Sequence, residues 1–184
     1  MTRTVAVLVG SLRSQSINHT VAKALAKVAE GRLVFDFVEI GDLPLYNDDL
    51  WHDGRGPEPV ERMRAQIAAA DGVLLVTPEY NRTVPGVLVN ALDWGSRPWG
   101  QSVWVNKPAG CCGAATGAIG TAAAQLALKA QMVTLGMVVM GHPEFYLKFD
   151  PEKFAEDGTV TDESLRGFLK NYADALAAHI ERLS

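Results

Sequence analysis

Short, continuous apolar runs recur along the chain at intervals that suit a sheet covered on both faces. The clearest runs are 5–9 (VAVLV), 72–77 (GVLLVT) and 136–141 (GMVVMG), and weaker ones occupy 33–40 and 108–113. Strands that are apolar on both faces are typical of parallel sheets, because helices cover each face of such a sheet. The pattern therefore predicts five buried parallel strands.

Between these runs the apolar residues recur every three or four positions, as they do on one face of an amphipathic helix. Helices are expected at 17–28, 60–70, 85–94, 121–135 and 165–183. Alternating strands and helices predict an α/β fold, a doubly wound five-stranded parallel sheet with helices on both faces. Five strands suit the flavodoxin-like order 2-1-3-4-5, in a single domain over residues 1–184. Residues 144–161 interrupt the alternation, and Asp157-Gly158 predicts either a small hairpin or a loop there.

The composition excludes several classes of protein. Hydrophobic residues make up 48% of the chain and charged residues 21%, which excludes a disordered, collagenous or coiled-coil chain. No apolar run is long enough to span a membrane. The net charge of −4 includes no basic stripe, so no nucleic acid is expected as a partner. Cys111 and Cys112 are adjacent and poorly placed to join distant segments, which favours a cytoplasmic protein with an inert, buried pair. No pair of the four histidines has metal-ligand spacing, so no metal site is predicted.

The loop after the first predicted strand carries the most informative chemistry. Residues 10–18 (GSLRSQSIN) hold three serines, one arginine and one asparagine, and lead into a helix. A helix N-terminus offers free N–H groups and the positive end of a dipole, so it favours an anion. The loop matches neither a Walker A motif nor GxGxxG, and hydroxyls with one guanidinium suit a terminal monophosphate. The alternative is an ordinary polar turn with a serine cap.

Two further loops meet the first one if the predicted strand order is right. Residues 77–86 (TPEYNRTVPG) are stiffened by two prolines, and Tyr80 in this loop could stack on a flat ring. Residues 113–121 (GAATGAIGT) are small and would let a ligand approach the backbone closely. Each loop singly is also compatible with simple packing. Three such loops at one edge of the sheet favour a ligand site.

These three segments resemble the NADPH-dependent FMN reductase family, the flavodoxin-like group that includes quinone, chromate and azo-dye reductases. The matching motifs are GSLRSQSIN at 10–18, TPEYNRTVPGVLVNALDWGSR at 77–97 and GAATGAIGTAAAQ at 113–125. The resemblance implies that the FMN phosphate is held by the first motif, through Ser11, Arg13, Ser16 and Asn18. It implies that Pro78, Glu79, Tyr80 and Asn81 line the flavin and ribityl, and that 115–117 approaches the ring. The implied cofactor-binding set is Ser11, Arg13, Ser16, Ile17, Asn18, Pro78, Glu79, Tyr80, Asn81, Arg82, Ala115, Thr116 and Gly117.

The chain departs from this family's pattern at two positions that bear on the site. The family often has serine or threonine where Ala115 stands, and arginine where Ala123 stands. The resemblance also implies homodimers or homotetramers. The alanine-rich helix at 121–135 would allow close approach of a second helix, and one of Trp94 and Trp99 is expected at the interface.

The function that follows is an FMN-dependent NAD(P)H oxidoreductase. A hydride would pass from NADPH or NADH through bound FMN to a small-molecule acceptor such as a quinone, azo dye, metal oxyanion or free flavin, with ping-pong kinetics. The chemistry is carried by N5 of the flavin, so no catalytic side chain is expected. Two alternatives are a reductase that supplies reduced FMN to a monooxygenase and a flavodoxin-type electron carrier. The modest net charge argues against the carrier, which would dock by acidic steering.

Overall fold

A computed structural model describes residues 2–155 and 157–184, and its centre is a parallel sheet. The strands are β1 (Arg3–Val9), β2 (Leu33–Val38), β3 (Gly72–Val76), β4 (Pro108–Ala115) and β5 (Val138–Val139). They are arranged in the order β2-β1-β3-β4-β5, and every pair is parallel. The predicted flavodoxin-like order is therefore confirmed.

The edge of the sheet beyond β4 differs from the prediction. Only Val138–Val139 of the expected strand at 136–141 pairs with β4, and a sixth strand, β6 (Tyr146–Lys148), pairs in parallel with the far half of β4. Gly136 has a φ of 80°, so β5 starts only after it, and Pro143 has no N–H to donate to a ladder. The fifth position of the sheet is thus filled by two short strands.

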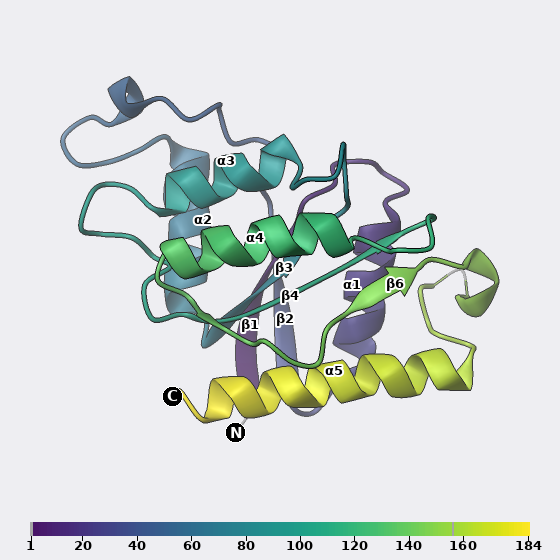
Figure 1. The fold of residues 1–184 in the computed structure, drawn as a ribbon. Coiled ribbons are helices and arrows are strands. Elements are labelled where there is room, and N and C mark those ends of the chain that lie inside the picture. Colours follow the sequence, from purple (N-terminus) through teal and green to yellow (C-terminus); the bar gives the residue numbers. More distant parts are fainter. Residues whose placement is uncertain (1, 156) are drawn as a thin grey trace.

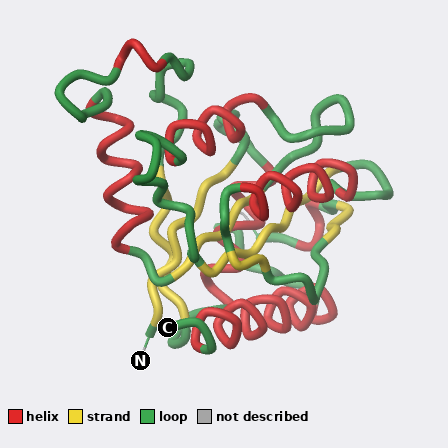
Figure 2. Tube along the Cα trace, turned by 60° about the vertical axis from the view of Figure 1, so that its left-hand side comes forward, coloured by secondary structure: helices red, strands yellow, loops and turns green. Residues whose placement is uncertain are grey.

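Helices cover both faces of the sheet (Figures 1 and 2). One apolar core contains residues of α1 (Ile17–Val28) and α5 (Glu163–Glu181), and the other contains residues of α2 (Glu58–Ala69), α3 (Gly86–Gly95) and α4 (Ala122–Thr134). Residues of β1 alternate between the two cores: Val5, Val7 and Val9 face the first, and Ala6 and Leu8 the second. This two-sided burial explains why the strand is a continuous apolar run.

The segment between β6 and α5 contains a short 3₁₀ helix, η2 (Pro151–Lys153), and then a tight turn. Phe154 and Val160 form an antiparallel bridge across this turn, and Gly158 has a φ of 78°. Of the two expectations for Asp157-Gly158, the small hairpin is therefore the one that forms. A second 3₁₀ helix, η1 (Asp48–Leu50), lies in the loop between β2 and α2. Among the described residues no helix is both long and apolar enough to cross a membrane.

Candidate flavin site

The loops after β1, β3 and β4 meet at the carboxyl edge of the sheet and enclose two adjoining cavities. The first, of about 180 Å³, is lined by Ser11, Arg13, Ser16, Ile17, Asn18, Pro78, Glu79, Tyr80, Ala114, Ala115 and Thr116. The second, of about 260 Å³, is lined by Glu79, Asn81, Arg82, Ala115, Gly117, Ile119 and Gly120. Every residue predicted to bind the cofactor borders one of them, and Glu79 and Ala115 border both.

A third cavity, of about 460 Å³, is bordered by the loop after β1, by Tyr80 and by the beginning of α3. It shares Ser11, Arg13 and Tyr80 with the sites above. Of its remaining lining residues, Gly10, Leu12, Pro85 and Gly86 lie in the two predicted loops 10–18 and 77–86, and Val87 lies just beyond them. Ala114, Ile119 and Gly120 lie in the predicted loop 113–121 but were not assigned individually, because small and apolar residues offer no polar group that would mark them in a sequence.

The phosphate loop, residues 10–18, presents donors that the rest of the protein leaves free. Within the described chain, the backbone N–H groups of 11–18 donate to no protein acceptor. Ser16 caps α1 by accepting from the His19 N–H at 3.3 Å, and both Ser16 and Ser11 are almost completely buried. Arg13 is exposed and forms no ion pair among the described residues. A loop with free N–H groups, hydroxyls and an uncommitted guanidinium is suited to a phosphate.

Asn18 in the same loop has a different environment. Its side chain is 2% exposed, its Nδ2 donates to the Ala114 carbonyl at 3.0 Å, and its Oδ1 accepts from the Ala114 N–H at 2.9 Å. The amide thus joins the beginning of α1 to the end of β4, 96 residues away. This pairing could not be read from the sequence, because it depends on how β1 and β4 are placed in the sheet.

The loop after β3 turns sharply between Tyr80 and Thr83. These two residues exchange backbone hydrogen bonds of 3.2 and 3.0 Å, and Asn81 and Arg82 between them have φ values of 52° and 63°. Two consecutive positive φ angles define a tight two-residue turn that asparagine tolerates well. The turn leaves Tyr80 47% exposed beside the cavities, where its ring can contact a planar ligand.

Glu79 fastens this loop to α4. Its side chain is 7% exposed; one carboxylate oxygen accepts from Arg82 at 3.0 Å, and the other accepts from the Ala124 N–H at 3.1 Å. Ala124 lies in the first turn of α4, where free N–H groups and the helix dipole favour a negative charge. Because both oxygens are engaged, this acid is compatible with an anionic ligand in the neighbouring loop.

The end of β4 forms a close-packed wall behind the ring-facing loops. A methyl group at Gly113 would overlap the Thr77 carbonyl oxygen and the Thr121 hydroxyl, so the two loops are in direct contact here. Cys111 and Cys112 are free and buried in this strand, as predicted. Burial raises the pKa of the Cys111 thiol to about 11, so this thiol stays protonated at neutral pH and is a poor nucleophile.

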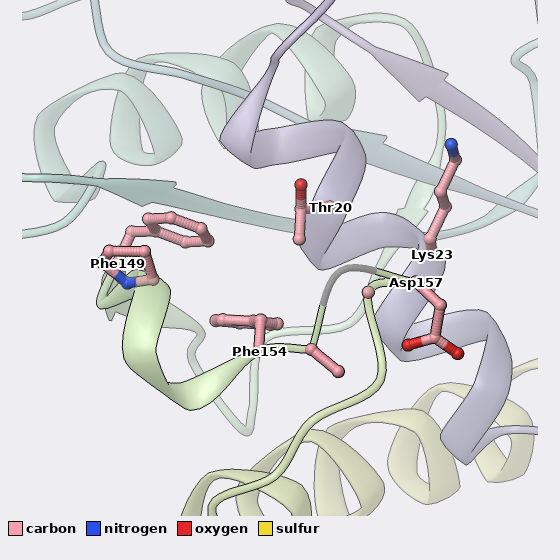
Figure 3. Close-up of a pocket in the computed structure, with 8 residues that line it drawn as sticks. Thr20, Lys23, Phe149, Phe154 and Asp157 are labelled. Carbon is pink, nitrogen blue, oxygen red and sulfur yellow. The ribbon is translucent and has the colours of Figure 1, made fainter.

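Another cavity, of about 330 Å³, lies between α1 and the segment that follows β6 (Figure 3). The rings of Phe149 and Phe154 stack at 5.0 Å, and the Lys23 ammonium points away from them. Asp157, at the far wall, is bound by Lys27 at 2.7 Å. This cavity shares no lining residue with the three at the carboxyl edge, and none of its residues was predicted to bind a ligand.

FMN fits the groups at the carboxyl edge. Its phosphate matches the free N–H groups, the serine hydroxyls and Arg13, while the exposed Tyr80 ring and the small residues at 115–117 suit a flat ring. A flavodoxin-like sheet with a phosphate loop after β1 and two ring-facing loops beside it is the framework of a flavin-binding protein.

Comparison with known proteins places the chain within this class. The family described as NADPH-dependent FMN reductase matches residues 3–152. The structure of FerB, a flavoenzyme NAD(P)H:(acceptor) oxidoreductase from Paracoccus denitrificans, superposes with a TM-score of 0.95 at 50% identity, covering 98% of both chains. A 2-hydroxy-1,4-benzoquinone reductase from a Burkholderia species is 49% identical over 96% of this chain and 95% of its own. A quinone reductase from Pseudomonas putida is 46% identical over 96% of this chain and 94% of its own.

The chain belongs to the NADPH-dependent FMN reductase family. It is an oxidoreductase that uses FMN as cofactor and NAD(P)H as cosubstrate. A flavodoxin from an archaeon, with a TM-score of 0.59 and 11% identity, shares the fold alone.

Proposed function

We propose that this enzyme reduces quinones, using NAD(P)H as electron donor and a retained FMN. The observation that carries the proposal is the convergence of the three loops around cavities that border both a phosphate loop and an exposed aromatic ring. The names of the similar proteins from Burkholderia and Pseudomonas putida support a quinone as acceptor. Azo dyes, metal oxyanions and free flavin are the other acceptors to be compared with it.

The residues of the chain would bind and orient the cofactor rather than take part in bond making. FMN supplies the hydride chemistry when it is bound. We assign the phosphate to Arg13, Ser11, Ser16 and the free N–H groups of the first loop, because these donors are uncommitted within the protein. Tyr80 and the backbone at 115–117 would contact the ring and its ribityl chain.

We further propose that donor and acceptor use the same open face of the site in turn. If the opposite face is covered by the loops at 77–86 and 113–121, NAD(P)⁺ must leave before the quinone binds, by the logic of two-step catalysis. Initial-rate plots at several fixed quinone concentrations should then be parallel, and a high concentration of quinone should inhibit competitively against NAD(P)H. Intersecting lines together with a ternary complex would show that two separate sites exist.

Three further measurements separate this function from the two alternatives. Loss of turnover on dilution that is restored by added FMN would favour a reductase that releases its flavin. A yellow protein that NADPH does not bleach in the absence of oxygen would favour an electron carrier. Flavin dissociation constants in both redox states complete the comparison.

We propose a homodimer, with a homotetramer as the larger option, and α4 as part of the interface. Leu126 and Val133 lie seven residues apart on α4 and are 63% and 64% exposed, and Ile119, in the turn before the helix, is 50% exposed. Seven residues are about two helical turns, so Leu126 and Val133 lie on one face of α4, and the small residues Ala123 and Ala130 lie three or four positions from them on the same face. Trp94 is buried in the core, whereas Trp99 is 88% exposed and remains the candidate for an interface.

Light scattering at micromolar protein tests this assembly. We expect at least a dimer, and Leu126→Glu should shift the mass towards the monomer because a charge would be buried in the seam. The matched control is Arg166→Glu on the exposed side of α5, which should leave the mass unchanged. A wild-type monomer would contradict the proposal.

A cytoplasmic location is also proposed. It is supported by two free, buried cysteines and by the use of NAD(P)H as cosubstrate. Fractionation of cells with an antibody against the protein tests it, and recovery outside the cytoplasmic fraction would contradict it.

A further inference from the structure

We infer that Asn18 is a positioning residue for the flavin: it fastens the phosphate loop to the end of β4 and thereby sets the ring-facing loop relative to the phosphate site. The inference rests on the proposed flavin site and assigns Asn18 a role other than that of a phosphate ligand. It concerns the second residue of α1, which the family motif places among the phosphate-binding residues.

The Asn18 side chain links two backbone segments by hydrogen bonds. Nδ2 donates to the Ala114 carbonyl at 3.0 Å and Oδ1 accepts from the Ala114 N–H at 2.9 Å, so one amide satisfies both backbone groups of one residue. Ala115, the next residue, borders both cavities of the site. The Ala115 carbonyl accepts from the Phe149 N–H at 2.8 Å, which holds the end of β4 on its other side.

The chemistry of the amide limits what else it can do. A side-chain amide has two N–H donors, and its oxygen has two lone pairs. At Asn18 one donor and one lone pair are used by Ala114, and the side chain is 2% exposed. The phosphate has other donors nearby that no protein group uses: the N–H groups of 11–18 and the Arg13 guanidinium. The phosphate therefore has donors other than the second Nδ2 proton of Asn18, whereas Asn18 binds both backbone groups of Ala114.

The two roles predict different effects on two ligands. Riboflavin has the ring and ribityl of FMN but lacks its phosphate. A residue that binds the phosphate contributes to the binding of FMN but not of riboflavin. A residue that positions the ring-facing loop contributes to both ligands, because it changes where Ala115 and its neighbours lie relative to the first loop.

The test is a titration of the full-length chain, freed of flavin, with FMN and with riboflavin, followed by quenching of flavin fluorescence. Asn18→Leu keeps the approximate size of the side chain and removes both polar atoms. It leaves the Ala114 N–H and carbonyl without their partner, which is costly for buried groups. We expect this variant to weaken the binding of FMN and of riboflavin by the same factor, about tenfold.

The chain offers a matched control in Asn90. Its amide makes the same kind of bridge, accepting from the Tyr46 N–H at 2.8 Å and donating to the Pro44 carbonyl at 2.9 Å, and it is 8% exposed. This bridge fastens the loop after β2 to α3, and none of its three residues lines the cavities of the flavin site. Asn90→Leu should lower the thermal midpoint as Asn18→Leu does, yet leave both dissociation constants unchanged.

The outcomes are separable. Weakening of FMN with riboflavin unaffected would overturn the inference and make Asn18 a phosphate ligand; unchanged affinity for both ligands would overturn it as well. If Asn18→Leu and Asn90→Leu lost flavin affinity to the same extent, the loss would reflect a general decrease in stability, and this result would also overturn the inference. If Asn18→Leu does not fold, Asn18→Ser, which keeps one polar atom, replaces it. This variant should also weaken FMN and riboflavin binding equally, but by a smaller factor. A wild-type chain that bound neither flavin would instead overturn the proposed function.

Discussion

The two halves of the candidate site are built in different ways. The phosphate half is one continuous loop, residues 10–18, whose donors are side chains and N–H groups that need no partner from elsewhere in the protein. The ring half is assembled from 77–86 and 113–121, which contact each other at Gly113 and Thr77 and are tied to α4 through Glu79. The first half depends on which residues are present, and the second depends on how distant segments are held together.

This difference predicts two kinds of mutational effect. A change to a donor that faces the phosphate, such as Arg13, removes a contact to one part of the ligand, so its effect should depend on whether the ligand carries a phosphate. Asn18 is expected to behave like the ring half, because its amide is bound to the end of β4. A change in the ring half moves backbone, so its effect should extend to any flavin. The following substitutions test this contrast.

The largest selective effect is expected at Arg13. Arg13→Ala removes the cation from the phosphate loop, and losing one partner of a charge-assisted contact costs about 2–5 kcal/mol when the other stays buried. FMN should bind well over tenfold more weakly, while riboflavin binding barely changes. Fluorescence titration with both ligands measures this, and Lys23→Ala on the other side of α1 serves as the control. Equal losses for the two ligands would contradict the assignment.

The ring half is tested by a pair of glycines, Gly113 at the end of β4 and Gly141 after β5. Gly113→Ala places a methyl group against the Thr77 carbonyl and the Thr121 hydroxyl, and such overpacking costs about 1–3 kcal/mol. We expect a lower thermal midpoint and weaker binding of both FMN and riboflavin. Gly141→Ala is the control, because a Cβ there has open space around it, φ is not in the left-handed region and the residue lines none of the three cavities. If both variants had the same thermal midpoint and the same flavin affinity, close contact between the two loops would not determine the structure of the ring half.

A smaller effect is expected at Glu79. Glu79→Gln keeps a hydrogen-bond acceptor for the Ala124 N–H but removes the charge at the N-terminus of α4, which contributes about 0.3–1 kcal/mol. The thermal midpoint should fall by about 2–4 °C per kcal/mol for a chain of this length. Differential scanning calorimetry measures the shift.

Arg82→Ala provides the comparison for Glu79. It removes only the ion pair to a guanidinium that is 72% exposed, so its effect on the thermal midpoint should be smaller. A larger effect for Arg82→Ala than for Glu79→Gln would show that the ion pair, rather than the cap on α4, holds the loop.

The sequence predicted more of the phosphate half than of the ring half. The apolar runs predicted five strands, and the flavodoxin-like order that five strands suit predicted that three loops would meet. The donors of the motif GSLRSQSIN could be identified from the sequence, because its hydroxyl groups and its cation are recognised without knowing what surrounds them. The bridges made by Asn18 and Glu79 were not predictable, since each reaches a backbone group far along the chain whose position depends on the whole sheet.

The edge of the sheet illustrates the same limit. The run at 136–141 looked like a complete fifth strand, yet only two residues pair, and Tyr146–Lys148 fills the rest of the position. Local apolarity does not show where strand pairing begins or ends, because pairing also depends on the backbone, here the positive φ at Gly136 and the missing N–H of Pro143.

What the sequence determined by itself was the class of fold and the chemistry of the phosphate loop, because hydrophobic period and helix-terminus chemistry are local properties of neighbouring residues. What only the tertiary structure decided was which polar groups remain free for a ligand. The amide of Asn18 and the carboxylate of Glu79 are polar groups of the predicted site that the protein itself uses, whereas Arg13 and the N–H groups beside it are left unpaired within the described chain. The distinction depends on long-range backbone contacts, and those exist only once the sheet has formed.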